Sequence, residues 1–151
     1  MGTAREGQRF MIKEFDGSLK DCDDILLIDK EVFNEIKIDA SALQLLLARR
    51  EVYRVLIAYV EGEPAAYIGL MYASTPHYKG LWVDLLATRP RFQSQGLATA
   101  LTQKALELAQ AEKLECITAI VRPGNCSSLA VFDKLGFTPS VEAYTLLTKD
   151  L

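Results

Sequence analysis

Apolar residues recur along this chain with two different spacings. Continuous apolar or β-branched runs between turn residues predict strands, and apolar positions three or four residues apart predict amphipathic helices. In chain order the pattern predicts a strand at 9–15, helices at 19–34 and around 41–47, strands at 54–60, 65–72 and 81–88, a helix from Gly96, a strand at 115–121, a helix from Asn125 to Leu135 and further strands within 138–151. Three successive strands joined by short turns and followed by a helix predict an α+β arrangement.

Turn and capping residues mark the ends of several of these elements. Either Asp39 or Ser41 can cap the second helix. Gly136 is placed to end the helix that begins at Asn125, because glycine adopts the left-handed conformation that commonly follows a helix.

A polar loop joins the strand that ends at Thr88 to the helix that follows Gly96. The first N–H groups of a helix have no partner within it, and the helix dipole favours negative charge there. Gly96 and Ala98 carry little or no side chain, so a phosphate could approach the backbone closely. Neither the three-glycine dinucleotide fingerprint nor the Gly-Lys-Ser/Thr of the P-loop is present. The loop therefore predicts an anion site, with an ordinary turn as the alternative.

Length and charge limit the class of protein. A chain of 151 residues, half hydrophobic and a quarter charged, is typical of one globular domain, which we expect to span residues 1–151. The net charge of −3 argues against a nucleic-acid-binding face. No apolar run approaches the roughly 20 residues that cross a bilayer, and residues 1–8 lack the apolar core of a signal peptide, so we expect no membrane association.

The cysteines and the histidine narrow the chemistry. Cys22, Cys116 and Cys126 are odd in number and lack CxxC spacing, which indicates free thiols in a reducing compartment and hence a cytoplasmic protein. His77 is the only histidine, so a site built from several histidines is excluded, and we expect no metal.

Two motifs resemble those of the GNAT family of N-acetyltransferases. Gln93-Ser-Gln-Gly-Leu-Ala98 resembles the family's Arg/Gln-x-x-Gly-x-Gly/Ala loop, and Asn125–Phe137 resembles its Asn-x-x-Ala…Tyr-x-x-x-Gly-Phe signature. The motifs stand in the family's order, one helix and one strand apart, and the resemblance covers nearly the whole chain. It implies the GNAT fold, with a mixed, mostly antiparallel central sheet, about four flanking helices, and strands that splay at an acetyl-CoA site.

The resemblance also implies which residues hold acetyl-CoA. The end of the strand before the loop would present backbone groups to the acetyl and pantetheine arm, and the loop N–H groups would wrap the pyrophosphate, with the Thr99 hydroxyl as a further donor. Asn125 would reach the pantetheine arm, the alternative being a simple helix cap. The implied cofactor-binding residues are Leu86, Ala87, Thr88, Gln93, Ser94, Gln95, Gly96, Leu97, Ala98, Thr99, Asn125 and Phe132. Arg89 and Arg91 either add positive charge beside the phosphates or are solvated surface residues.

One position departs from the family pattern. Phe132 stands where the family commonly has a tyrosine that protonates the departing thiolate. Phenylalanine cannot donate a proton, so another group or water does so, or the thiolate leaves unassisted.

Asp84 is the candidate for the base or amine anchor. It is the only acid in an otherwise apolar strand, and strand alternation predicts that it shares a face with Leu86 and Thr88. A carboxylate among apolar residues is costly unless it is wet or paired, which is why such residues are often functional. A solvated aspartate at the sheet edge is the alternative.

Two further regions are candidates for the acceptor side. The helix junction Phe33–Lys37 is where we expect substrate contacts. Tyr72, His77 and Tyr78 either line the acceptor site or are ordinary turn residues.

The combined prediction is an acetyl-CoA-dependent N-acetyltransferase that acts on a primary amine, of a small molecule, by direct transfer in a ternary complex. A non-catalytic acetyl-CoA-binding or regulatory domain is one alternative, favoured by Phe132. An acetyltransferase acting on protein lysines or N-termini is another. The sequence leaves open whether the protein is a monomer or a homodimer.

Overall fold

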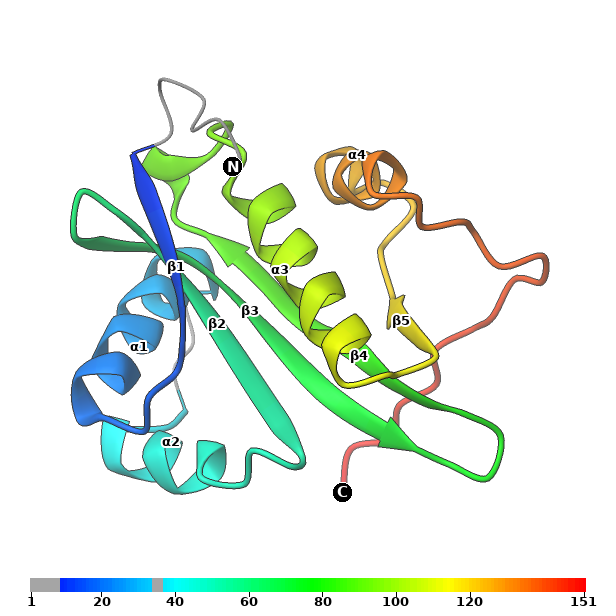
Figure 1. The fold of residues 1–151 in the computed structure, drawn as a ribbon, viewed down its shortest axis with the longest axis horizontal. Coiled ribbons are helices and arrows are strands. Elements are labelled where there is room, and N and C mark those ends of the chain that lie inside the picture. Colours follow the sequence, from blue (N-terminus) through cyan, green and yellow to red (C-terminus); the bar gives the residue numbers. More distant parts are fainter. Residues whose placement is uncertain (1–8, 34–36) are drawn as a thin grey trace.

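A five-stranded sheet forms the centre of the computed structural model, which describes residues 9–33 and 37–151 (Figure 1). Its strands are arranged in the order β1-β2-β3-β4-β5, antiparallel throughout except that β5 runs parallel to β4. In chain order the elements are β1 (Phe10–Glu14), α1 (Leu19–Phe33), α2 (Ala40–Leu47), β2 (Tyr53–Val60), β3 (Glu63–Ser74), β4 (Lys79–Thr88), a 3₁₀ turn (Pro90–Phe92), α3 (Leu97–Ala111), β5 (Cys116–Ala119) and α4 (Cys126–Lys134). The predicted α+β class and mostly antiparallel sheet are confirmed.

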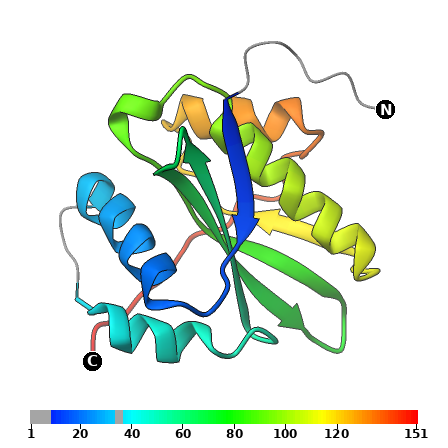
Figure 2. The ribbon, with the colours of Figure 1, turned by 60° about the vertical axis from the view of Figure 1, so that its left-hand side comes forward.

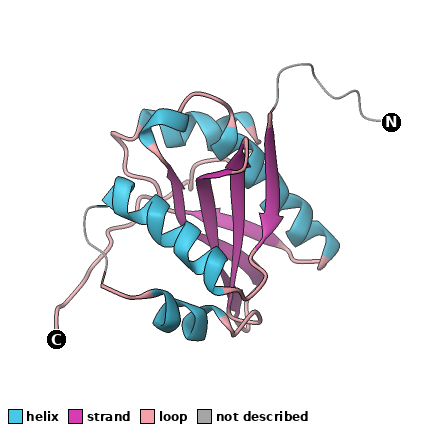
Figure 3. Cartoon of the chain, turned by 90° about the vertical axis from the view of Figure 1, so that its left-hand side faces the viewer, coloured by secondary structure: helices cyan, strands magenta, loops and turns pink. Residues whose placement is uncertain are grey.

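Helices cover both faces of the sheet. α1 and α2 lie on one face and α3 on the other, as Figures 2 and 3 show. Alternate residues of β2 and β3 face these two layers, so Leu56 and Ile68 pack with α3, whereas Ile57 and Tyr67 pack with α1 and α2. The sheet is therefore buried on both sides, which explains the continuous apolar runs in β2 and β3.

A β-bulge at Asp84 changes the alternation of side chains along β4. Leu70 of β3 pairs with Val83 but its neighbour Gly69 pairs with Leu85, so Asp84 is the extra residue. After the bulge, Leu86 packs on the α3 side and Leu85 on the α1 side.

Beyond the bulge, β4 continues without β5. The parallel pairing runs from Gly80 and Cys116 to Val83 and Ala119 and ends there, whereas β4 extends to Thr88. Within the described residues, the outer edge of residues 84–88 of β4 is therefore unpaired. The splay that the GNAT fold implied is present at this point.

The C-terminal residues do not form the predicted strands. Residues 138–151, which we call the C-terminal arm, have no strand assignment and are exposed throughout. Their apolar content suggested strands, but a strand exists only where a neighbour pairs with its backbone, and no such neighbour is present among the described residues.

The predicted helix ends agree with the structure in two places. Of the two candidate caps, it is Asp39 that caps α2, accepting a hydrogen bond from the Ala42 N–H at 2.8 Å. Gly136 follows α4 with φ +85°, the left-handed conformation that ends a helix.

In the described part of the chain, none of the helices has the length and apolar character needed to cross a bilayer.

Candidate functional site

A cleft of about 650 Å³ opens where the end of β4, the loop after it, α3 and α4 meet. It brings together the predicted residues Leu86, Ala87, Thr88, Gln93, Ser94, Gly96, Leu97, Ala98, Thr99 and Asn125. Val32 and Phe33 of α1, Phe92 of the 3₁₀ turn, and Ser127, Ser128 and Val131 of α4 complete the lining. The predicted residues Gln95 and Phe132 are not part of it.

The start of α3 forms the polar end of the cleft. Gly96 is the N-cap with φ +81°, and a Cβ built on it meets no atom within 4 Å, so its surroundings are open. Gly96 has no side chain and makes no capping bond. Within the described chain, the first N–H groups of α3 are therefore uncovered. Ser94 is also held at positive φ, +63°. This backbone can receive an anionic oxygen through N–H groups.

Arg89 anchors the end of β4 to α1. Its guanidinium donates to both oxygens of Glu31, at 2.9 and 2.8 Å, and to the Pro64 carbonyl at 2.8 Å, and only 7% of the residue is exposed. Arg91 pairs with Glu63. Neither arginine is free to face the cleft, so the proposed phosphate contacts are not supported, and Arg89 is not a solvated residue either.

Asn125 is a helix cap, one of the two roles that the sequence left open, and its contact with a pantetheine arm stays a prediction. Its side-chain Oδ1 accepts a hydrogen bond from the Ser128 N–H at 3.2 Å, so it caps α4, and the residue also lines the cleft. The cap uses the oxygen and leaves the amide nitrogen as a donor for a ligand.

Phe132 lies outside the cleft. The residue is buried and its ring packs edge-to-face on Phe137, with the ring centroids 5.0 Å apart. It lines a separate hollow between α4 and β5, while its neighbour Val131 faces the cleft. Phe132 therefore does not line the cleft as predicted, because adjacent helical positions point in different directions.

Asp84 accepts a hydrogen bond from the Tyr53 hydroxyl at 2.6 Å. Tyr53 starts β2, so its ring must cross β3 to reach β4, and it does so over Gly69. A Cβ at Gly69 would overlap the Tyr53 hydroxyl and lie 2.9 Å from a ring carbon. The bulge puts Leu86 on the α3 side, whereas Asp84 bonds Tyr53 on the α1 side, so the prediction that the two residues share a face was wrong.

A second tyrosine–aspartate pair lies in the same layer. Tyr67 of β3 donates to Asp29 of α1. Burial raises the pKa of Asp29, and the hydrogen bond from Tyr67 opposes that rise. Burial first, and then the neighbouring carboxylates, raise the pKa values of Tyr53 and Tyr67, so both hydroxyls stay protonated. Asp29 and Asp84 both contribute to the raised pKa of each tyrosine, so the four side chains form one polar cluster.

The remaining candidates take structural positions or lie partly outside the described residues. Tyr72 bonds Glu112 and Arg54 on the α3 side, and the Tyr78 hydroxyl accepts from the Trp82 indole at 2.9 Å. His77 is exposed in the β3–β4 turn. Phe33 lines the cleft, whereas residues 34–36 of the predicted contact region lie outside the described part of the chain.

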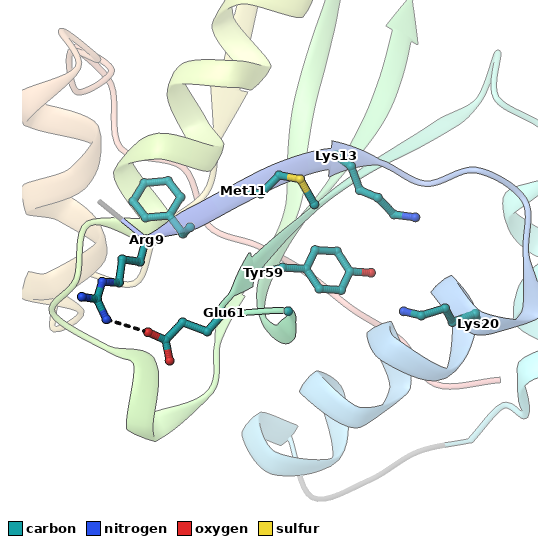
Figure 4. A pocket seen from close by; sticks show the side chains of 8 residues that line it. Arg9, Met11, Lys13, Lys20, Tyr59 and Glu61 are labelled. Carbon is teal, nitrogen blue, oxygen red and sulfur yellow. Dashed lines mark hydrogen bonds and ion pairs between the residues drawn. The ribbon is translucent and has the colours of Figure 1, made fainter. Parts of the chain in front are cut away.

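A second hollow, of about 600 Å³, lies between β1 and α1 (Figure 4). Tyr59 forms its floor, and cationic side chains surround it, but each cation is neutralised by an acid of the same chain. The ion pairs are Arg9–Glu61, Lys13–Asp21 and Lys20–Asp24. This hollow therefore presents no uncompensated charge to a ligand, unlike the start of α3.

The model of the acetyltransferase (GNAT) family matches residues 19–137, which include every element from α1 to α4. The chain belongs to this family. No curated relative matches the sequence.

Solved GNAT structures share the fold. An aminoglycoside acetyltransferase, meta-AAC0020 from an uncultured soil metagenomic sample, in complex with sisomicin, matches with TM-score 0.76 and 15% identity over 93% of this chain and 97% of its own. The aminoglycoside acetyltransferase AAC(6')-Iy with a CoA-linked bisubstrate analogue matches with TM-score 0.77 and 14% identity over 95% and 100%. A ribosomal-protein-alanine N-acetyltransferase from Brucella melitensis matches with TM-score 0.71 and 14% identity over 93% and 99%. At these identities the likeness shows the fold alone.

The tyrosine–aspartate cluster lies outside the residues that line the cleft, although Asp84 precedes the cleft residue Leu86 by only two positions on β4. Sequence reasoning found the cleft but missed Tyr53, Tyr67 and Asp29. Gly69, isolated within an apolar strand, was the one available signal, since such a glycine often marks close approach of another group.

Proposed function

We propose that this GNAT protein transfers the acetyl group of acetyl-CoA to a primary amine of a small molecule, by direct transfer in a ternary complex. The observation that supports the proposal most is the cleft itself. The cleft is lined by the uncapped start of α3, the unpaired end of β4 and the residue Asn125. These are the groups that an elongated ligand with a phosphate at one end and amide groups along its length requires.

Acetyl-CoA supplies the acetyl group already activated as a thioester. In the proposal, the N–H groups at the start of α3 bind the pyrophosphate, and the unpaired backbone of residues 86–88 lines up the pantetheine arm. A backbone N–H at that edge donates to the thioester carbonyl, where negative charge develops during transfer. Holding both reactants in place supplies much of the rate.

Asp84 serves the acceptor amine in this proposal. Tyr53 holds one carboxylate oxygen, Oδ2, and Oδ1 remains to bind an ammonium group or accept its proton, directly or through water. The amine must be neutral to attack, so a base near the acceptor is the main chemical requirement that the protein has to meet. Phe132 lies outside the cleft, so the proposal leaves protonation of the thiolate to water.

The acceptor class rests on charge. The cluster presents two carboxylates, Asp84 and Asp29, on the α1 side of the sheet, which favours a cationic acceptor. Among the structural neighbours, two carry sisomicin or a neamine-based analogue, which are small cationic amines, and a third is a ribosomal-protein-alanine acetyltransferase, so the small-molecule acceptor is proposed from the charge of the cluster. As part of the same proposal, the three free thiols favour a reducing, cytoplasmic location.

An amine panel tests the proposal. Wild-type protein is mixed with acetyl-CoA and amines that include aminoglycosides, polyamines and lysine peptides, and loss of the thioester absorbance is followed. Thiol reagents are avoided, because Cys116 and Cys126 are exposed and would react. We expect turnover with at least one small amine, with the acetylated product identified by mass. Turnover with peptides alone would favour the protein acetyltransferase, and CoA binding without any turnover would favour the regulatory domain.

A further inference from the structure

Three side chains on neighbouring strands form a row on the α1 side of the sheet. Tyr53 of β2 pairs with Met71 of β3, and Met71 pairs with Trp82 of β4, so their Cα atoms lie side by side across the strands. The residue before each of the last two, Leu70 or Leu81, packs on the α3 side, so strand alternation turns both side chains to the α1 side. We call Tyr53, Met71 and Trp82 the apolar row.

Part of the apolar row is uncovered. Met71 is 39% exposed and Trp82 is half-buried, and neither belongs to or packs against the buried core on either face. The β3–β4 turn, which follows Met71 and precedes Trp82, extends away from α1 and α2 (Figures 1 and 2). The C-terminal arm is exposed throughout, so it does not bury the row either. Apolar surface that stays open in this way commonly marks an interaction site.

The Trp82 indole presents its ring, and not its N–H group, to a ligand. Its Nε1 donates a hydrogen bond to the Tyr78 hydroxyl at 2.9 Å. This bond uses the one polar group of the indole and limits rotation of the ring. What remains for contact is flat apolar surface, which suits another aromatic ring.

Asp84 places a negative charge beside the apolar row. It follows Trp82 by two residues on β4 and is exposed. The Tyr53 ring crosses Gly69 and its hydroxyl bonds Asp84, so Tyr53 joins the row to the carboxylate. Among the described residues, no lysine or arginine forms an ion pair with Asp84. The carboxylate is therefore available to a cation from outside the chain.

We propose that the acceptor is an arylalkylamine, a primary amine joined by a short alkyl chain to an aromatic ring. The ring packs on Met71 and Trp82, and the ammonium group binds Oδ1 of Asp84, the oxygen that Tyr53 does not hold. Polyamines and aminoglycosides carry charged or hydroxyl groups along their length, and these lose hydration against an apolar surface. The inference rests on the proposed function for the reaction, but binding of the amine does not require acetyl transfer.

Titrations of phenethylamine and of its two halves test the proposal. Ethylamine keeps the amine without the ring, and phenethyl alcohol keeps the ring without the charge. We expect a Kd for phenethylamine at least about tenfold below that of either half, because ring burial and charge both contribute. Trp82 is the only tryptophan of the chain, so phenethylamine should change the tryptophan fluorescence and ethylamine should not. An equal Kd for phenethylamine and ethylamine, or unchanged fluorescence at saturation, overturns the proposal.

Variants of the apolar row locate the ring. Met71→Ser should raise the Kd of phenethylamine by about fivefold or more and leave that of ethylamine unchanged. Met11→Ser is the matched control, since it replaces a methionine of β1 that is 61% exposed and lies outside the row, and it should change neither Kd. Trp82→Ser should weaken phenethylamine more than Met71→Ser does. Equal effects of Met71→Ser and Met11→Ser in calorimetry would show that the ring does not lie on the row.

Turnover with acetyl-CoA separates this inference from the proposed function. We expect kcat/KM for phenethylamine to exceed that for spermidine by about tenfold or more. If phenethylamine binds as expected but no amine is acetylated, the binding site stands and the proposed function fails. If spermidine is acetylated with an equal or higher kcat/KM, the proposed function stands and the arylalkylamine is overturned.

Discussion

The two parts of the site are built from different materials. The cleft at the start of α3 is lined mainly by one continuous stretch, Leu86 to Thr99, with backbone N–H groups at its polar end, and residues of α1 and α4 complete it. The proposed acceptor side consists of side chains from α1, β2, β3 and β4, held by the Tyr53–Asp84 and Tyr67–Asp29 hydrogen bonds. A ligand that is common to a whole family can be bound by backbone groups, which do not depend on the side chains. An acceptor that differs between members can be bound by side chains, which differ between sequences. If this division is right, each part can be damaged while the other still works.

The largest expected effect on the acceptor side comes from Asp84→Asn. Removing a positioned acid–base group should lower kcat by about 10²- to 10⁴-fold, while CoA affinity stays at the wild-type value. Rates with the best amine of the panel and a CoA titration measure the two quantities. Asp23→Asn, the same change at an exposed position of α1, is the control and should leave both unchanged. Near-normal turnover of the Asp84 variant would return this residue to the role of a solvated aspartate.

Gly69→Ala should displace Tyr53 from Asp84. The added methyl group overlaps the tyrosine, so we expect a loss of about 1–3 kcal/mol of folding free energy, as for other overpacked sites, together with reduced kcat. Denaturant unfolding measures the stability. In a Tyr53→Ala background the same methyl group has space, and the extra cost should vanish in the double-mutant cycle. Equal costs in both backgrounds would show that Gly69 has another role.

Tyr53→Phe tests the hydrogen bond alone. Losing a bond to an exposed carboxylate should lower kcat by about tenfold or less, with the fold intact. The raised pKa of Tyr53 keeps its hydroxyl protonated up to at least about pH 9, so the pH profiles of variant and wild type should have the same shape between about pH 7 and 9. A step in the wild-type profile that the variant lacks would mean that Tyr53 titrates and acts as an acid or base.

The smallest effect is expected from Phe132→Tyr. The ring lies in the hollow beside β5 and not in the cleft, so the new hydroxyl should change neither kcat nor CoA affinity by more than about twofold, which is close to the error of such comparisons. Steady-state kinetics checks this. A clear rise in kcat would place the hydroxyl near the thiolate and contradict the position of α4.

Local sequence predicted the loop and the start of α3 because local rules determine them. A strand, a break at Pro90, a polar loop and a glycine before a helical pattern follow one another directly, so no distant contact is needed to place Gly96 at the start of α3. The caps at Asp39 and Gly136 were predicted for the same reason. These features depend on neighbours within four residues.

Features that depend on distant partners were not predictable in the same way. A bulge opposite Gly69 of β3 interrupts the alternation between Asp84 and Leu86, so regular alternation along β4 wrongly placed the two side chains on one face. The burial of Arg89 requires Glu31 of α1, and the Tyr53 bond requires a residue of β2 to cross a glycine. The strands predicted within residues 138–151 are absent for a similar reason, because an apolar pattern does not show whether a neighbouring strand edge is within reach.

The most direct test of the account is a calorimetric titration of CoA into wild type, Gly96→Asn and Gly96→Asp. Asparagine and aspartate have nearly the same shape and both tolerate the positive φ of this position better than most residues, so the pair differs mainly in charge. A carboxylate about 4 Å from a phosphate costs about 1 to 4 kcal/mol, or roughly fivefold to thousandfold in Kd. We expect the Kd of CoA to be at least about fivefold higher for Gly96→Asp than for Gly96→Asn, while both variants remain folded. Equal CoA affinity in the two variants would contradict phosphate binding at the start of α3.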